Sequence, residues 1–238
     1  MGLGIFPTPE NHYLIRRTTK RLLGKVGVSI HRMSRFERLL QRELEKDEPF
    51  VFVQVGANDG VSFDNLFQFN RKHRTSGLVI EPLSDMFERL RYNYRSRPSI
   101  TPIRVAVHPT AASVTMYRAH SDKLYDLPHW ASGIGSLHPD WHDKTGIASD
   151  AIVKEEVPAV HLMELLRQHS IDRLNLLQVD VEGFDAEVIQ MIDFDVLRPA
   201  IIKYECVHCG GDDSLIPLLQ KHAYQLERDG DDMIAWQK

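Results

Sequence analysis

The feature that most constrains the fold is a repeated alternation of short apolar runs with segments whose apolar residues recur at helical spacing. The apolar run FVFVQV at 50–55 is followed by a helical pattern at 64–73, an apolar run at 77–81, a helical pattern at 84–94 and a third run at 100–108. Short runs rich in Val, Ile and Phe are typical of strands that are buried on both faces. Strands that alternate with helices in this way predict an α/β fold, with a mostly parallel sheet and crossover helices.

The alternation resumes after a long interruption and ends in a hairpin. Helices are predicted at 161–169, 185–192 and 214–223, and strands at 173–180 and 199–206. The last segment, 224–236, has apolar residues on both sides of Asp229 and Gly230, a dipeptide typical of tight hairpin turns. It predicts two antiparallel strands that close the sheet.

Length and composition place most of the chain in one domain. A chain of 238 residues, of which 42% are hydrophobic, is long enough to bury one substantial core. Ser34 and Glu37 have the spacing of a capping box, which predicts a helix from about Ser34 to Lys46 that ends before Pro49. We therefore expect an N-terminal helical extension at 1–48 and a main domain at 49–238.

The charge and cysteine content exclude several classes of protein. The net charge of -4 gives no general reason to expect a nucleic-acid partner. The only cysteines, Cys206 and Cys209, fit a reducing compartment, and a zinc site with four ligands would need a second pair. No stretch approaches the ~20 apolar residues of a membrane-spanning helix, and the N-terminus lacks a signal-peptide pattern. These features predict a cytoplasmic protein.

A basic segment near the N-terminus is the exception to the balanced charge. Residues 11–35 contain no Asp or Glu, but they carry several Arg and Lys residues beside apolar ones such as Leu22 and Val26. Such a segment either makes peripheral contact with an anionic membrane surface, or is a solvated helical arm packed on the domain. The oligomeric state is left open by the sequence, with a homodimer as one option.

The interruption at 119–150 is too long for an ordinary connection within a compact domain. Its tryptophans and histidines argue against disorder, and the sequence SGIGSL at 132–137 supplies hinges for a lid. The tryptophans either stack on a substrate or anchor the loop to the core. The candidate substrate-binding residues in this loop are Trp130, Ser136, His138 and Trp141.

Polar residues follow several of the predicted strands, at the edge of the sheet where ligands of open parallel sheets bind. Gly56 and Gly60 after the first strand allow a tight turn, after which the next helix presents free N–H groups. Glu81 ends the second strand, where an acid can accept hydrogen bonds from both hydroxyls of a ribose. This pairing indicates an adenosine-type cofactor. The third glycine of the dinucleotide fingerprint is missing, which disfavours the alternative of a nicotinamide-dependent oxidoreductase.

The motifs FVQVGANDG, GLVIEP, RVAVH, LLQVDVEGFDAEVI and YECVH, in that order, closely resemble the FkbM-type family of S-adenosylmethionine-dependent methyltransferases. The resemblance runs from about Phe50 to the C-terminus. It implies a Rossmann-like class I methyltransferase fold, with a mostly parallel seven-stranded sheet whose last strand is antiparallel. It also implies O-methylation of a hydroxyl on a small molecule, on a sugar of a glycan or on a natural product. A relative that binds a ligand or partner without catalysis is the remaining alternative.

The resemblance, together with the positions of the strand ends, assigns residues to the cofactor. Gln54 stands where many relatives carry an acid. Asn58 and Asp59 would contact the amino-acid end of S-adenosylmethionine, Glu81 its ribose, and the turn at 106–108 its adenine. The predicted cofactor-binding residues are Gln54, Gly56, Ala57, Asn58, Asp59, Gly60, Glu81, Pro82, Ala106, Val107 and Asp180.

Methyl transfer is an in-line displacement that needs an aligned hydroxyl and gains from a base that takes its proton. The candidate catalytic residues are His208, Asp180 and Glu205, with Glu182 as a further substrate-binding residue. His208 has a reference pKa near ~6.5, which suits a base, but a structural role is an alternative. Asp180 and Glu182 could instead cap the following helix. The acids could also bind a divalent metal ion, but oxygen-rich strand ends do not establish such a site, and none is predicted.

Overall fold

The computed structural model describes residues 33–62, 65–128, 131, 133–206 and 212–237. The chain divides into two compact units, Met1–Arg38 and Leu39–Lys238. The predicted boundary after residue 48 stays a prediction, as does membrane contact through 11–35, most of which lies outside the described residues. Across the described ranges, no helix has the length and apolar character needed to cross a membrane.

Helix α2 (Arg35–Leu44) begins with the predicted capping box. The backbone N–H of Ser34 donates to Glu37 Oε2 at 2.7 Å, and the N–H of Glu37 donates to Ser34 Oγ at 3.1 Å. Two N–H groups that the first helical turn cannot satisfy are thus paired reciprocally. The predicted helix start is confirmed.

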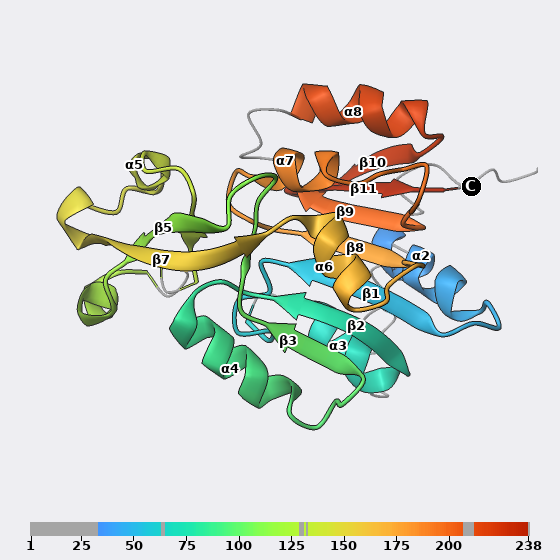
Figure 1. Ribbon diagram of the computed structural model, residues 1–238, viewed down its shortest axis with the longest axis horizontal. Coiled ribbons are helices and arrows are strands. Elements are labelled where there is room, and N and C mark those ends of the chain that lie inside the picture. The colour runs from blue at the N-terminus through green and yellow to red at the C-terminus, as the bar shows by residue number, and fades with distance from the viewer. Residues whose placement is uncertain (1–32, 63–64, 129–130, 132, 207–211, 238) are drawn as a thin grey trace, which may run out of the picture. The chain divides into compact units, whose positions relative to one another are not determined.

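The main sheet has seven strands in the order β10-β11-β9-β8-β1-β2-β3. Their bounds are β1 (Phe50–Val55), β2 (Thr75–Ile80), β3 (Ile100–Ile103), β8 (Leu176–Val179), β9 (Ile201–Glu205), β10 (Gln225–Asp229) and β11 (Asp232–Trp236). The pairs that join β1, β2, β3, β8 and β9 are parallel, whereas β11 runs antiparallel to both β9 and β10. The predicted seven-stranded sheet with an antiparallel last strand is confirmed (Figure 1).

Helices cover both faces of this sheet, because alternate residues of each strand point to opposite faces. Val53 and Val55 of β1 pack in one cluster with residues of α6 (Leu162–Gln168), α7 (Asp185–Gln190) and α8 (Asp212–Lys221). Phe50 packs edge-on against Phe69 of α3 (Asn65–Lys72), with ring centroids 5.1 Å apart. Phe67 of α3 in turn contacts Tyr94 of α4 (Ser84–Tyr94). In Figure 1, α6 lies in front of the sheet and α3 behind it.

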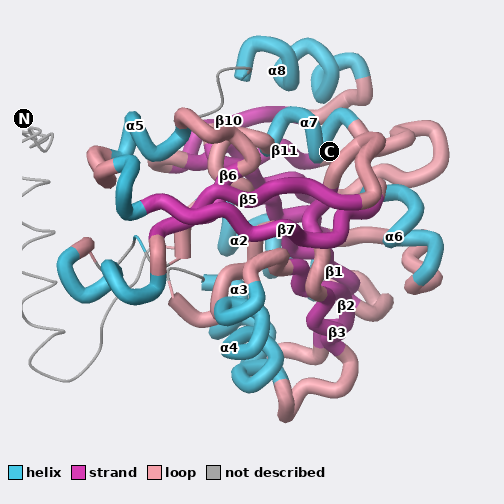
Figure 2. The backbone as a smooth tube through the Cα atoms, turned by 60° about the vertical axis from the view of Figure 1, so that its left-hand side comes forward, coloured by secondary structure: helices cyan, strands magenta, loops and turns pink. Residues whose placement is uncertain are grey.

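A second sheet forms an arm, which we define as residues 113–160. Its order is β4-β7-β5-β6, with β4 (Ala106–Val107), β5 (Ser113–Ala119), β6 (Gly135–Ser136) and β7 (Ile152–Val160). Strands β5 and β7 are antiparallel and run side by side along the arm (Figure 2). The long interruption between them contains the short helices η1 (Ser121–Asp126), α5 (Trp141–Thr145) and η3 (Ser149–Ala151) as well as β6.

The predicted third strand at 100–108 is wrong as a single element. Residues 100–103 form β3, which pairs with β2 in the main sheet, whereas Ala106 and Val107 form β4, which pairs with β7 in the arm. The strand therefore changes sheets at Arg104 and Val105. The predicted helix at 84–94 forms α4 as expected, with Leu83 at its N-cap position and no side-chain cap bond.

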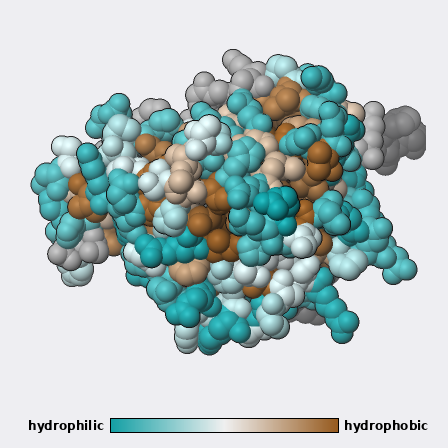
Figure 3. Space-filling view, viewed as in Figure 1, coloured by the Kyte–Doolittle hydropathy of each residue, from teal (hydrophilic) through white to brown (hydrophobic). Residues whose placement is uncertain are grey.

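The face of the protein visible in Figure 3 is largely hydrophilic, with apolar residues in separate patches. The central strands are fully buried at Phe52, Val53, Ile80, Leu176 and Ile202. Strands buried on both faces account for the continuous apolar runs in the sequence.

Candidate active site

A cavity of about 770 Å³ opens at the carboxyl ends of β1, β2, β4 and β8. The sequence-predicted residues that line it are Gln54, Gly56, Ala57, Asn58, Glu81, Pro82, Ala106, Val107, Trp141, Asp180, Glu182 and Glu205. Asp59, Gly60, Ser136 and His138 are not part of its wall, and Trp130 and His208 lie outside the described residues. Residues from separate stretches of sequence thus meet at one edge of the sheet.

Backbone hydrogen bonds hold the turn after β1 to the end of β2 and close the turn itself. The N–H groups of Gly56 and Ala57 donate to Ile80 O at 3.0 and 2.9 Å, and that of Gly60 donates to Ala57 O at 2.8 Å. A Cβ on Gly56, whose φ is +79°, would lie 1.8 Å from Asp180 O. The ends of β1 and β8 approach so closely here that any side chain at residue 56 would clash, and glycine is therefore required.

The Asp59 carboxylate accepts hydrogen bonds from the residues that follow it in this turn. Its Oδ1 accepts hydrogen bonds from the N–H groups of Val61 and Ser62, and its Oδ2 accepts one from Ser62 Oγ. Burial acts to raise the pKa of Asp59, but the bonds from Ser62 and Val61 outweigh burial and lower the pKa. Gly60 is used for packing, since a Cβ there would lie 2.5 Å from Leu90 Cδ1. Contact of either residue with a cofactor stays a prediction.

The free N–H groups predicted at the start of the next helix stay a prediction, because residues 63–64 lie outside the described residues. The N–H groups of the turn itself are paired within the chain. The N–H of Asn58 donates to Glu81 Oε2 at 2.8 Å, and that of Asp59 donates to Asn58 Oδ1 at 2.7 Å. With the bonds of Gly56, Ala57, Gly60, Val61 and Ser62, every N–H from 56 to 62 has a partner in the chain. A ligand at this turn would meet its carbonyls and side chains, not a row of donors.

Glu81 is only 5% exposed and holds the cavity wall together. Its Oε1 accepts from the N–H of Leu83 at 2.9 Å and its Oε2 from the N–H of Asn58. Burial raises the pKa of Glu81 to about 7, against the two N–H bonds, which lower it. An ionised carboxylate has about four acceptor positions, so about two remain for a ligand.

The wall beside Glu81 is apolar. Leu83, Ala106, Val107, Met116 and Leu137 line this part of the cavity. Leu83, Ala106 and Met116 form one buried cluster, against which Leu137 packs. Such a surface suits a flat, weakly polar ring.

The opposite wall is acidic. Burial, followed by the charges of Asp180 and Glu205, raises the pKa of Glu182 to about 8, while the Trp141 side chain favours its ionised form. Burial and the charges of Asp180 and Asp232 raise the pKa of Glu205 to about 7. Several carboxyl groups thus share one region, where they disfavour each other's ionisation.

Asp185 is a further buried acid behind this wall. It is 0% exposed, and burial with the charges of Asp180 and Glu205 raises its pKa to about 8. The N-cap position of α7 is Phe184, which makes no side-chain cap bond. The alternative that Asp180 and Glu182 cap this helix is therefore wrong.

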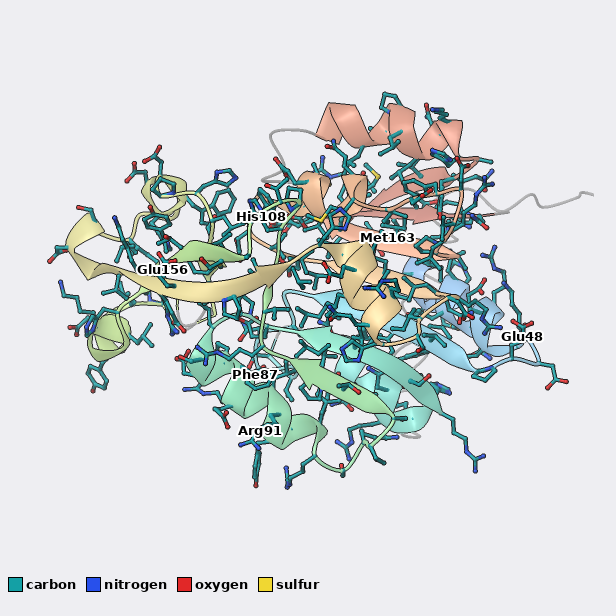
Figure 4. The ribbon with its side chains drawn as sticks, in the orientation of Figure 1. Glu48, Phe87, Arg91, His108, Glu156 and Met163 are labelled. Carbon is teal, nitrogen blue, oxygen red and sulfur yellow. The ribbon has the colours of Figure 1, made fainter. Side chains whose placement is uncertain are left out.

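Two aromatic rings stack at the rim of the cavity. Phe184, which lines the cavity, stacks on His108 with centroids 5.6 Å apart and planes at 10°. His138 contacts the same ring at 6.1 Å. Figure 4 shows His108 near the junction of the arm with the rest of the domain.

The sequence did not single out several residues of the wall. These include Leu83, Met116, Gln178, Phe184 and Asp231. Gln178 could have been predicted from the sequence, because it is a polar residue that interrupts an apolar strand. In the structure it lies opposite Gln54 in the β1–β8 register. Met116 had no such signal, since only the folding of the arm brings it to the cavity.

Within the described residues, no group of three or more His, Cys, Asp or Glu side chains has an arrangement that could hold a metal ion. Cys206 is buried, and its Sγ donates to Asp231 O at 3.3 Å. Cys209 lies outside the described residues.

A family model described as "Methyltransferase FkbM domain" matches residues 54–233, which is most of the chain. The chain belongs to the FkbM methyltransferase family. The resemblance predicted from the motifs is thereby confirmed, and membership supports S-adenosylmethionine-dependent methyl transfer in general. The family gives no support to a nicotinamide-dependent oxidoreductase.

Solved methyltransferases show a distant likeness to this FkbM protein. Precorrin-6y C5,15-methyltransferase from Geobacter metallireducens GS-15 is 13% identical over 88% of this chain and 92% of that chain, with a TM-score of 0.41. A methyltransferase from Geobacter sulfurreducens is 11% identical over 99% and 93%, with a TM-score of 0.44. The METTL16 methyltransferase domain is 13% identical over 98% and 82%, also at 0.44. Comparison with curated proteins gives no match.

Proposed function

We propose that this FkbM protein is an S-adenosylmethionine-dependent O-methyltransferase whose acceptor is a hydroxyl group on a sugar of a glycan or on a natural product. The observation that carries the proposal is the position of Glu182. Glu182 lines the cavity with Asp180 and Glu205, and its carboxyl is close enough to theirs for their charges to raise its pKa, so we place it where it can take a proton from a hydroxyl.

The cavity fits S-adenosylmethionine by shape and by charge. Glu81 retains acceptor positions for two ribose hydroxyls, and the apolar wall around Ala106, Val107 and Met116 suits adenine. The acidic wall of Asp180, Glu182 and Glu205 suits a ligand with positive charge. Gln54 and Asn58 line the end of the cavity at the turn after β1, where the amino-acid end would lie.

The cofactor, when bound, supplies a methyl carbon made electrophilic by its positively charged sulfur. The remaining task of the chain is to hold a hydroxyl oxygen in line with that carbon and to remove its proton. A base within hydrogen-bond reach of the hydroxyl contributes about 10²- to 10⁴-fold to the rate.

Glu182 is suited to be this base. A pKa of about 8 leaves its carboxyl largely protonated at neutral pH. A positive charge nearby favours the ionised form and lowers the pKa, so a cationic ligand would make Glu182 ready to accept a proton. Glu205, with a pKa of about 7, and Asp180 would help to orient the acceptor. His208 stays a further candidate from the sequence.

Two aromatic side chains favour a sugar as acceptor. Trp141 and Phe184 both line the cavity, next to the acidic wall. A sugar ring has apolar C–H faces and polar edges, which match an aromatic ring beside carboxylates. We therefore place the acceptor between these rings and Glu182.

The test is methyl transfer from tritium-labelled S-adenosylmethionine to a panel of methyl glycosides of hexoses and deoxyhexoses. Glu182→Gln should lower kcat by about 100-fold, because the base is lost. Its affinity for S-adenosylhomocysteine, measured by isothermal titration, should change by less than about threefold. The control is Glu88→Gln, whose carboxylate is exposed and pairs with Arg91.

Transfer only to nitrogen or carbon acceptors would overturn the O-methylation proposal. Binding of S-adenosylhomocysteine without turnover on any acceptor of the panel would favour a relative without catalysis. An unchanged kcat in Glu182→Gln would move the base elsewhere, with Glu205 and His208 the next to substitute.

A further inference from the structure

The arm segment 133–141 packs on the loops that follow β1 and β2. A Cβ on Gly133 would lie 1.9 Å from Asn58 Nδ2, and a Cβ on Gly135 would lie 2.9 Å from Leu83 Cδ1. Neither position has room for a larger side chain without movement of its neighbour. The two glycines therefore let the arm segment approach the cofactor side of the cavity closely.

The same arm segment also packs on the loop after β8. Ser136 Oγ donates to the backbone carbonyl of Glu182 at 3.0 Å, and it accepts from the N–H of His138 at 3.1 Å. Trp141 lies against Gly183, where a Cβ would be 3.0 Å from Trp141 Cζ3. One short segment thus contacts three loops of the active site.

Ser136 is completely buried and is not part of the cavity wall. A direct contact with the acceptor, as the sequence suggested, is therefore not its role in this arrangement. Its hydroxyl instead binds the backbone carbonyl of Glu182, a residue of the cavity wall.

The backbone of Glu182 is in a conformation that needs support. Its φ is +54°, and that of Gly183 is +94°. Left-handed backbone is uncommon for a residue such as Glu, and it persists where surrounding contacts enforce it. The bond from Ser136 and the ring of Trp141 are the contacts that do so on the arm side.

We propose that Ser136 and Trp141 are positioning residues, which hold Glu182 with its carboxyl directed to the acceptor hydroxyl. This inference rests on the proposed function. The arm, which supplies Trp141 to the acceptor side of the cavity, would thereby also set the base. A change in the arm that alters the acceptor would then alter the rate as well.

Substitutions of Ser136 and Trp141 test this role. Ser136→Ala removes the donor to Glu182 O, and we expect about a fivefold to tenfold lower kcat with a cofactor affinity within about twofold of wild type. Ser136→Thr keeps the hydroxyl and should restore most of the rate. Trp141→Phe keeps a ring over Gly183 but removes the indole N–H. The control is Tyr125→Ser, since Tyr125 lies in the arm and is 98% exposed.

The decisive readout does not depend on turnover. In protein with ¹³C-labelled Glu side chains and bound S-adenosylhomocysteine, the Glu182 signal is assigned by its loss in Glu182→Gln and titrated by NMR. The Trp141 side chain favours ionised Glu182, so Trp141→Phe should move the titration midpoint to higher pH. Tyr125→Ser should leave the midpoint unchanged.

The outcomes separate the two proposals. A wild-type kcat together with an unchanged Glu182 titration, in both Ser136→Ala and Trp141→Phe, would overturn the positioning role. Equal losses of turnover and cofactor affinity in Ser136→Ala would also overturn it, since they indicate general disruption. A shifted titration in Trp141→Phe, with no methyl transfer to a hydroxyl by the wild type, would support the positioning of Glu182 and refute the proposed function.

Discussion

Arg118 of the arm forms a two-pronged ion pair with Asp85 of α4, with Nη1 2.5 Å from Oδ1 and Nη2 2.7 Å from Oδ2. Arg118 Nη1 also lies 3.1 Å from Glu155 Oε2, and Glu155 Oε1 accepts from the N–H of Ser84. The pair links β5 to the first turn of α4, next to Leu83 and Glu81. The guanidinium charge lowers the pKa of Glu81, although burial raises it more.

Replacement of Arg118 should therefore weaken cofactor binding. Arg118→Met keeps much of the apolar length but leaves the charge of Asp85 unopposed, so the pKa of Glu81 rises further above 7. More Glu81 is then protonated at pH 7, and a protonated acid has fewer acceptor positions for a ribose. We expect the Kd for S-adenosylhomocysteine to rise by about threefold to tenfold at pH 7 and to recover partly at pH 8.5, measured by isothermal titration. Arg91→Met is the control, because Arg91 pairs with Glu88 on the exposed side of α4. Equal weakening at both pH values would contradict an effect through Glu81.

Removal of the Glu81 carboxylate should be more severe. In Glu81→Ala the N–H groups of Asn58 and Leu83 lose their acceptor, and the proposed ribose contacts are lost as well. Each buried group left without a partner costs about 1–3 kcal/mol, so the Kd for S-adenosylhomocysteine should rise by at least about 30-fold. Glu88→Ala serves as control. An unchanged Kd in a variant that still folds would place the cofactor elsewhere.

Substitution of Gly56 can separate the cost of steric overlap between β1 and β8 from the cost of a left-handed backbone. Gly56→Ala puts a Cβ at 1.8 Å from Asp180 O, so the ends of β1 and β8 must separate. Gly146 has a similar φ of +73°, but a Cβ there would have nothing within 4 Å, so Gly146→Ala introduces the backbone strain alone. We expect Gly146→Ala to cost about 1 kcal/mol in urea unfolding and Gly56→Ala to cost about 3 kcal/mol or more. Similar losses in the two variants would show that close approach is not the reason for Gly56.

The sequence predicted the elements of the main domain because their signals are local. Alternating apolar runs place the strands, and the reciprocal bonds of Ser34 and Glu37 begin α2 as the capping-box pattern predicts. Glu81 and Asp180, which line the cavity, were predicted because strand ends of a parallel sheet meet at one edge. Family motifs supplied other residues that are predicted to bind the cofactor.

Features that depend on tertiary pairing were missed. Nothing between Ile103 and Ala106 indicates that the chain leaves one sheet for another, since β4 exists only through its pairing with β7. The burial of Ser136 and its bond to Glu182 O likewise follow from the return of the arm onto the sheet. The pairing of the N–H groups in the turn after β1 was not predicted either, because the side chains of Glu81, Asn58 and Asp59 reach several of them only in the folded chain.

The acidic wall should make the protein less stable as pH rises. The folded-state pKa values of Glu182, Asp185 and Glu205 are about 8, 8 and 7, above the usual values of 4.5, 3.8 and 4.5. The folded state therefore binds more protons than the unfolded state between about pH 4 and pH 8, and stability falls with pH across that window. Glu182→Gln removes one such group. We expect it to raise the melting temperature by about 2–4 °C at pH 8, which corresponds to about 1 kcal/mol for a chain of this size, and by less at pH 5. Calorimetry at both pH values checks the sign, with Glu88→Gln as control. A larger gain at pH 5 than at pH 8 would mean that Glu182 is ionised in the folded protein at neutral pH, and would contradict the raised pKa of this carboxyl.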